Sequence, residues 1–139
     1  YEVRSRFGGE PILMEKVARN VLKHRRRFRA LVLVADQSPG ERDNVYWTDW
    51  LNQPTAFFTG PATIAQLMDF PVMFARCRRK SRGRYHLSLI PIVETPGRLT
   101  EEGIIEAYIR AAEETIRDEP ESFLWSNRRW KHQPPADQA

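Results

Sequence analysis

The chain has 139 residues, 41% of them hydrophobic and 29% charged, with a formal net charge of +4; this composition suits one soluble globular domain. No segment approaches the roughly 18 to 20 apolar residues that a membrane-spanning helix needs. The lone Cys77 excludes an internal disulfide framework and a thiolate zinc site, and it suits a reducing compartment. Because the chain begins at Tyr1 without an initiator methionine or signal peptide, we expect it to be a piece of a longer protein.

The first predicted element is a helix that Pro11 opens and that the basic run 24–27 closes. Its apolar stripe is Ile12, Leu13, Val17, Ala18, Val21 and Leu22. The apolar run 31–35 then predicts a buried strand, which ends in a polar turn at Asp36 and Gln37. If this strand is parallel, both side chains lie at the edge of the sheet where α/β proteins bind ligands. The alternative is an ordinary turn closed by proline and glycine.

The segment 44–58 predicts a half-buried loop that contains a short strand. It holds the aromatic residues Tyr46, Trp47, Trp50, Phe57 and Phe58. Such residues usually pack in a core, although aromatics with a polar tip also suit acyl chains or a membrane surface. Thr59 or Gly60 then caps a helix that has Pro61 in its first turn and ends before Pro71.

The segment 72–77 predicts a second strand, which would form a right-handed parallel unit with the first strand and the helix between them. Residues 85–93 alternate in polarity and predict a hairpin partner with His86 and Ser88 on one face. Thr100 caps a long final helix that Pro120 ends. The apolar stripe of this helix is Ile104, Ile105, Tyr108, Ala111, Ala112 and Ile116. We expect one domain over 1–139, with a loose tail at 132–139.

Basic residues are gathered in three places along the chain. The clusters are Arg25, Arg26 and Arg27; Arg76, Arg78, Arg79, Lys80, Arg82 and Arg84; and Arg128, Arg129 and Lys131. Such clusters indicate anionic partners, and nucleic acid, acidic lipid headgroups or an acidic carrier protein would all fit. Solvated faces that keep the protein soluble are the ordinary alternative.

The sequence contains no common catalytic signature for nucleotide, zinc or serine hydrolase chemistry. His132 and Asp137 have four residues between them, a spacing that can serve a general base and its orienting acid. We interpret this pair as non-catalytic, because it spans two prolines in the predicted loose tail. His24 and His86 are interpreted as surface residues.

Three motifs together carry a family resemblance. They are Ala-Asp-Gln-Ser-Pro-Gly at 35–40, Phe-Phe-Thr-Gly-Pro-Ala-Thr at 57–63 and Leu-Trp-Ser-Asn-Arg-Arg-Trp-Lys at 124–131. In this order and at these separations, the chain resembles the late acyltransferases of lipid A biosynthesis. These are lauroyl and myristoyl transferases of the lysophospholipid acyltransferase superfamily, and the resemblance extends from Arg4 to Lys131.

The resemblance implies an α/β sandwich whose central, mainly parallel sheet is flanked by helices, and the chain is similar to its C-terminal half. Family members use a His-x4-Asp or His-x4-Glu motif as general base, and we expect that motif and a membrane-associated helix to lie upstream of Tyr1. We therefore expect no turnover from this chain alone unless a partner supplies the base. A partial sheet leaves an open edge and an uncovered face, so we expect the isolated chain to be marginally stable or to aggregate.

The resemblance also implies substrate-binding residues. They are Arg6 and Arg4 for phosphate or developing negative charge, Asp36 and Gln37 for the acceptor pocket, Thr59 to Thr63 beside it, Arg76 at a strand end, and Arg128 and Arg129 in the C-terminal signature. Asn127 stands where many relatives have histidine, so no role of that histidine carries over.

The implied reaction transfers a fatty acyl chain from an acyl carrier protein thioester to a hydroxyl of a lipid A precursor. The implied partners are the carrier, the precursor and the membrane surface. The implied location is the cytoplasmic face of the bacterial inner membrane. The reaction needs no further cofactor. A non-catalytic relative that binds lipid or carrier protein is one alternative. Another is a basic nucleic-acid-binding module, for which arginine clusters interleaved with Trp and Tyr would be the motivation; the family resemblance implies no nucleic acid partner.

Overall fold

The computed structural model describes residues 2–41 and 43–135, and its chain divides into two compact units, Tyr1–Val32 and Leu33–Ala139. The first unit holds the short helix α1 (Glu2–Ser5), a 3-10 turn (Met14–Lys16) and helix α2 (Val17–Lys23). Helix α2 begins later than Pro11, because Leu13 still has extended backbone dihedrals. The helix ends at Lys23, directly before the basic run, as predicted. Of the predicted apolar stripe, Val21 is buried, whereas Leu13, Ala18 and Leu22 are exposed.

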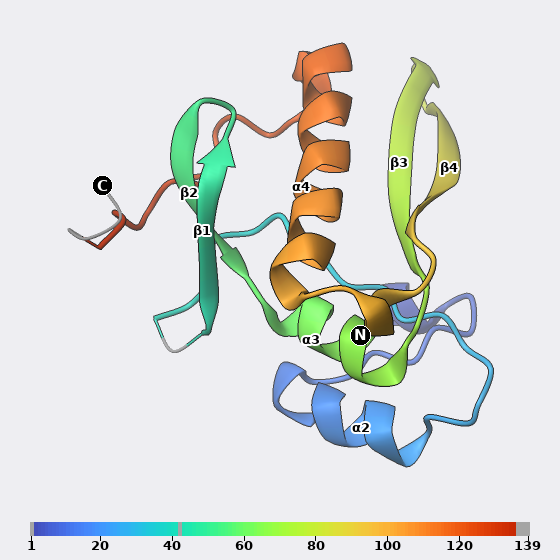
Figure 1. Cartoon of the computed structure of the whole chain (residues 1–139). Helices are drawn as coiled ribbons and strands as arrows, with labels where there is room; N and C mark the ends of the chain where they lie inside the picture. Colours follow the sequence, from blue (N-terminus) through green and yellow to red (C-terminus); the bar gives the residue numbers. More distant parts are fainter. Residues whose placement is uncertain (1, 42, 136–139) are drawn as a thin grey trace. The chain divides into compact units, whose positions relative to one another are not determined.

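The second unit consists of two antiparallel hairpins and two main helices (Figure 1). The elements are β1 (Val45–Trp50), β2 (Gln53–Phe58), α3 (Gly60–Met68), β3 (Val72–Ser81), β4 (Arg84–Val93) and α4 (Glu101–Asp118). Strand β1 pairs only with β2, and β3 pairs only with β4, within the described residues. The chain is therefore mixed α/β, but the predicted central parallel sheet is absent from the part that the structure describes.

The apolar run 31–35 is not a strand, which corrects the prediction for it. Val32 is 89% exposed and Val34 67% exposed. A buried parallel strand needs a hydrogen-bonding neighbour and a covering layer on both faces. The expected neighbour, β3, pairs instead with β4 in an antiparallel register that sets Cys77 opposite Leu87. The strand–helix–strand unit is therefore also absent.

The core of the second unit lies between the β1–β2 hairpin, α3 and α4. Its buried members are Trp50, Phe57, Ala62, Ala65, Ile104, Ile105, Ile109 and Ile116. Trp50 makes edge-to-face contacts with Phe57 at 5.5 Å and with Phe123 at 5.7 Å between ring centroids. The core interpretation of the aromatic segment 44–58 is confirmed for Trp50 and Phe57. The predicted loop, however, is a full hairpin.

The turn of this hairpin explains why sequence patterns missed it. Leu51 and Asn52 have φ values of 53° and 63°, the combination that a two-residue type I′ turn requires. Asn-Gly is the usual sequence for such a turn, whereas leucine is strained there. The strongest short-range hairpin signal is therefore missing from this segment.

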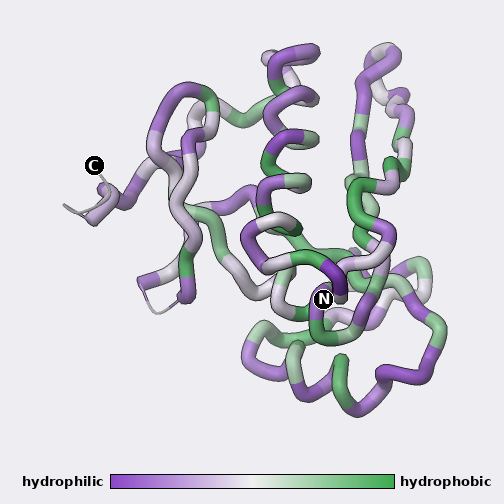
Figure 2. Tube along the Cα trace, in the orientation of Figure 1, coloured by the Kyte–Doolittle hydropathy of each residue, from purple (hydrophilic) through white to green (hydrophobic). Residues whose placement is uncertain are grey.

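The predicted helices α3 and α4 and the predicted β3–β4 hairpin are confirmed, but β3 continues past residue 77 to Ser81 and Thr59 makes no capping hydrogen bond with its side chain. Thr59 precedes α3, and Thr100 Oγ1 accepts a hydrogen bond from the Gly103 N–H at 3.2 Å at the start of α4. Helix α4 ends at Asp118, two residues before Pro120. His86 and Ser88 share a face of β4, with Nδ1 and Oγ 3.4 Å apart. Figure 2 shows the turn end of the β3–β4 hairpin as strongly hydrophilic, in agreement with the basic cluster there.

Candidate functional site

The polar turn at 36–39 and the C-terminal signature meet in space, although about 90 residues separate them. Ser38 Oγ donates to Arg129 O and lies 3.3 Å from Arg128 O. His132 Nε2 lies 2.9 Å from Pro39 O. Because a carbonyl oxygen only accepts, this imidazole carries its proton on Nε2. The first and third motifs therefore form one site.

Arg129 joins this site to the core. Its side chain is 1% exposed, and its Nη2 donates to Ala56 O at 2.7 Å. The guanidinium lies over the rings of Phe57 at 4.6 Å and Trp50 at 5.5 Å. Burial lowers the pKa of Arg129, and the negative charge of Asp36 partly opposes that effect. In this conformation the guanidinium fastens the C-terminal segment to β2 and is closed to solvent.

Asp36 and Gln37, in contrast, are exposed. Within the described residues, the Asp36 carboxylate forms no hydrogen bond or ion pair, but its charge acts on both Arg129 and Tyr108. Burial strongly raises the pKa of Tyr108, and the charge of Asp36 raises it further. Tyr108 therefore keeps its proton at neutral pH, and its hydroxyl can both donate and accept a hydrogen bond. The charge of Asp36 therefore influences the ionisation of both Tyr108 and Arg129.

The second motif shapes the start of α3. The Thr59 N–H donates to Asn44 O at 3.1 Å, and Thr63 Oγ1 lies 3.3 Å from Thr59 O. A Cβ atom on Gly60 would lie 2.2 Å from the Phe58 ring, so any larger residue here would displace that ring. No hydrogen bond joins Thr59 or Thr63 to the Asp36 turn in the part of the chain that the structure describes.

Arg76 lies on β3, where it forms an ion pair with Asp118 at the end of α4. Arg78 also pairs with Asp118 at 3.1 Å and with Glu119 at 3.2 Å. Arg76 borders an open groove of about 350 Å³ between α4 and the β3–β4 hairpin, together with Phe74 and Arg110. The structure thus places Arg76 away from the hydrogen bonds that join the first and third motifs.

Arg4 and Arg6 lie in the first unit. The Arg6 guanidinium lies 5.8 Å from the centroid of the Phe7 ring. The glycine pair that follows has a clear local reason: Gly8 has φ +84°, and a Cβ atom on Gly9 would lie 2.6 Å from Arg4 O. Arg128, in the second unit, has an exposed side chain, in contrast to Arg129.

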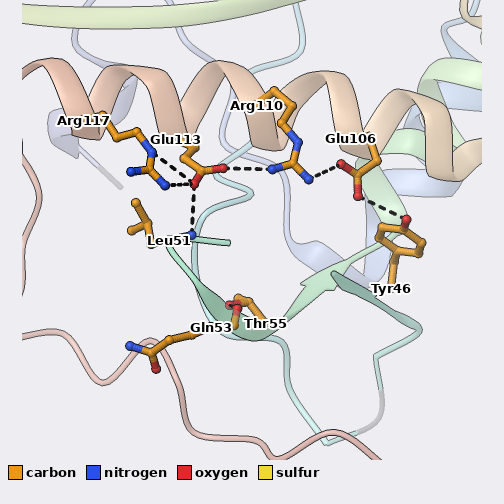
Figure 3. Close-up of polar contacts among 8 residues, drawn as sticks. All are labelled: Tyr46, Leu51, Gln53, Thr55, Glu106, Arg110, Glu113 and Arg117. Atoms are coloured by element: carbon orange, nitrogen blue, oxygen red, sulfur yellow. Dashed lines mark hydrogen bonds and ion pairs between the residues drawn. The ribbon is translucent and has the colours of Figure 1, made fainter. Parts of the chain in front are cut away.

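A second polar cluster fastens α4 to the turn of the first hairpin (Figure 3). Glu113 Oε1 accepts from the Leu51 N–H at 3.3 Å and from Arg117 Nη2 at 2.7 Å. Arg110 bridges Glu113 and Glu106 at 3.0 and 2.9 Å, and the Tyr46 hydroxyl donates to Glu106 Oε1 at 3.1 Å. Every carboxylate in this cluster is satisfied inside the chain. We interpret it as structural support for the strained turn.

The sequence-based list of site residues lacked Tyr108 and His132. Tyr108 was part of the apolar stripe of α4, and its hydroxyl is the one polar tip in that stripe. His132 was assigned to a loose tail, yet its side chain is half-buried against Pro39. Asp137, its proposed sequence partner, lies outside the described residues. His86 is exposed, as predicted, and His24 is half-buried.

The described residues hold no group of three His, Cys, Asp or Glu side chains that could bind a metal ion.

In the described residues, no helix is long and apolar enough to cross a membrane. Comparisons with curated proteins and with solved structures give no significant match. The family model of the bacterial lipid A biosynthesis acyltransferases, however, matches residues 1–132 and so includes all three motifs and His132. On this evidence, the chain belongs to the bacterial lipid A biosynthesis acyltransferase family.

Proposed function

We propose that this chain supplies the acceptor-binding part of an enzyme that transfers a fatty acyl chain from acyl carrier protein to a lipid A precursor. Family membership supports the reaction class. The observation that carries the proposal is the Asp36 carboxylate, which is exposed and unpaired within the described residues on a turn tied to the C-terminal signature. A carboxylate in this position can accept a hydrogen bond from a hydroxyl of the precursor.

In the proposed reaction, a general base removes the proton of that hydroxyl, and its oxygen attacks the thioester carbonyl carbon. Hydrogen-bond donors stabilise the tetrahedral oxyanion, which collapses with loss of the carrier thiolate. The proposed base is the histidine of a His-x4-Asp or His-x4-Glu motif upstream of Tyr1. General base assistance is worth about 10²- to 10⁴-fold in rate, so we expect no measurable transfer by the 139-residue chain alone.

The other predicted residues take roles in this proposal that follow their chemistry. Arg128 is exposed beside the turn, where its planar guanidinium could hold a precursor phosphate through two hydrogen bonds. Arg4 and Arg6 are proposed for phosphate or the developing negative charge. Gln37 lies next to Asp36 on the turn and can both donate and accept. Thr59 and Thr63 are proposed to border the acceptor pocket.

Two proposed roles fit the surroundings less directly. Arg76 already has an intramolecular partner in Asp118, so a substrate anion would have to compete for it. Arg129 is buried, so its proposed contribution to substrate binding is electrostatic and passes through Asp36.

The basic turn of the β3–β4 hairpin is proposed as the docking surface for the acidic carrier or for the anionic cytoplasmic face of the inner membrane. The donor is acyl carrier protein thioester, with no further cofactor.

The test is acyl transfer by the native-length protein from acyl carrier protein to a lipid A precursor. We expect Asp36→Asn to lower kcat/KM for the precursor about 10- to 100-fold, because the charged acceptor that positions the hydroxyl is replaced by a weaker, neutral one. Asp49→Asn is the matched control, since Asp49 is exposed on β1. An Asp36→Asn enzyme with unchanged kinetics would refute the role of the turn. Binding of carrier or precursor without transfer would instead indicate a non-catalytic relative.

A further inference from the structure

The Asp36–Pro39 turn has little local support for its position. It lies in no helix or strand, and the residues before it at 32–34 are exposed. The next local contacts come after it, where the Gly40 N–H donates to Asp43 Oδ2 at 2.7 Å and the Asp43 N–H donates to Gly40 O at 3.2 Å. A segment of this kind needs distant contacts to hold one conformation.

Residues Arg128–His132, here called the C-terminal strap, provide those contacts. The strap meets the turn through Ser38 Oγ, which donates to Arg129 O, and through His132 Nε2, which donates to Pro39 O. Pro39 is itself buried, so its carbonyl is held next to the imidazole. These two hydrogen bonds involve consecutive residues of the turn, Ser38 and Pro39, and together they restrict its position.

Contacts with β2 hold the C-terminal strap in place, so the strap can fix the position of the turn. Trp130 Nε1 donates to Thr55 Oγ1 at 2.9 Å, and the Trp130 ring lies 6.0 Å from the Trp50 ring. Arg129 adds its bond to Ala56 O and its position over Phe57. Thr55, Ala56 and Phe57 are all buried. A path of direct contacts therefore runs from the core of the unit to the turn.

We infer that the C-terminal strap sets the position of the acceptor-binding carboxylate, with Ser38 and His132 as its positioning residues. This inference rests on the proposed function, since it assumes that Asp36 binds the acceptor. His132 performs no proton transfer in it. The imidazole acts as a hydrogen-bond donor to a backbone carbonyl and influences the reaction only through the turn. Small displacements of a positioning group are costly because reacting atoms must be held at close range.

The test compares His132→Ala and His132→Gln with the control Gln133→Ala, an exposed neighbour. Loss of one positioning hydrogen bond is expected to lower kcat/KM for the lipid A precursor about tenfold in His132→Ala, with KM for acyl carrier protein unchanged. Glutamine keeps an N–H donor near the same reach, so His132→Gln is expected to recover most of the loss. Ser38→Ala should resemble His132→Ala, and Ser38→Thr should retain more activity.

A structural readout accompanies the kinetics. Backbone 15N relaxation of the 139-residue chain should show the order parameters of Gln37 and Ser38 falling from about 0.85 to below about 0.6 in His132→Ala, with those of α4 unchanged. Unchanged order parameters at the turn would overturn the inference. Lower order parameters without an effect on precursor kinetics would also overturn it, if Asp36→Asn does impair those kinetics. Normal kinetics in Asp36→Asn would overturn the proposed function itself, and with it the role of the C-terminal strap in acceptor binding.

Discussion

The two hairpins of the second unit differ in what holds them. Strands β1 and β2 have six residues each, yet they contribute fully buried side chains such as Trp50 and Phe57. Strands β3 and β4 have ten residues each, but Leu87 on the face away from α4 is 62% exposed. The shorter hairpin thus contributes side chains to the core, whereas the longer one contacts α4 through one face and leaves the other face exposed. Strand length is a poor guide to which hairpin anchors this unit.

The largest expected effect comes from emptying the core beneath the first hairpin. Trp50→Ala should lower the free energy of unfolding by about 3 to 5 kcal/mol, because it removes a completely buried indole that contacts Phe57 and Phe123. Urea unfolding followed by far-UV circular dichroism measures the change. Trp125→Ala is the control, and this exposed residue should cost about 1 kcal/mol or less. Equal losses in the two variants would contradict this account of the core.

The next effect tests the link between β2 and the C-terminal strap. Arg129→Met should cost about 1 to 3 kcal/mol, because Ala56 O loses its donor and two aromatic rings lose a cation. Arg128→Met, at an exposed side chain, should stay within about 0.5 kcal/mol. The same unfolding measurement compares the pair. If Arg129→Met leaves the free energy of unfolding unchanged, then removing the cost of burying the charge offsets the loss of both contacts.

A smaller, pH-dependent effect concerns the strained turn at Leu51. Burial alone would raise the pKa of Glu113, but hydrogen bonds from Arg117 and the Leu51 N–H, with the charges of Arg117 and Arg110, lower it overall. A depressed carboxyl pKa stabilises the fold above the unfolded value of about 4.3, and this stabilisation is lost as pH falls through the folded pKa.

Glu113→Gln should therefore cost about 1 to 2 kcal/mol at pH 7, where the ionised carboxylate is favoured, and much less near pH 2. Unfolding curves at several pH values measure the convergence of variant and parent. Glu114→Gln is the adjacent exposed control and should leave the pH dependence unchanged. Parallel pH profiles for the parent and Glu113→Gln would show that this carboxylate does not support the turn.

The smallest effect on stability is expected on the exposed face of the second hairpin. Leu87→Thr should change the free energy of unfolding by less than about 0.5 kcal/mol, since threonine suits a strand and the side chain is mostly exposed. It should reduce self-association of the isolated chain, because Tyr85, Leu87 and Leu89 are all exposed on β4. Sedimentation velocity measures this. The control is Leu67→Thr, at an exposed leucine on α3. An equal decrease in self-association for Leu67→Thr would show that the hairpin face has no special role.

Local sequence signals were sufficient wherever an element is stabilised by near neighbours in the chain. Thr100 and the apolar stripe of α4 predicted that helix, because capping and helical periodicity act within a few residues. The alternating pattern of 85–93 likewise predicted β4 and the shared face of His86 and Ser88. The three motifs predicted the family, which the match over residues 1–132 confirms.

Signals of burial alone were not sufficient. The run 31–35 is apolar enough for a core strand, but hydrophobicity does not say which strand will pair with it, and β3 pairs with β4 instead. The same limit applies to Arg129. Its sequence neighbours form a basic cluster, which is usually solvated, whereas the structure buries this one arginine over two aromatic rings.

By itself, then, the sequence determined the later helices, one hairpin and the family, because each depends on local chemistry or on the order of motifs. Only the tertiary structure decided that the Asp36 turn meets the C-terminal strap. The physical reason is that Ser38 and His132 donate to backbone carbonyls. Every residue carries such an acceptor, so the side-chain sequence cannot indicate which one a distant donor will reach until the chain has folded.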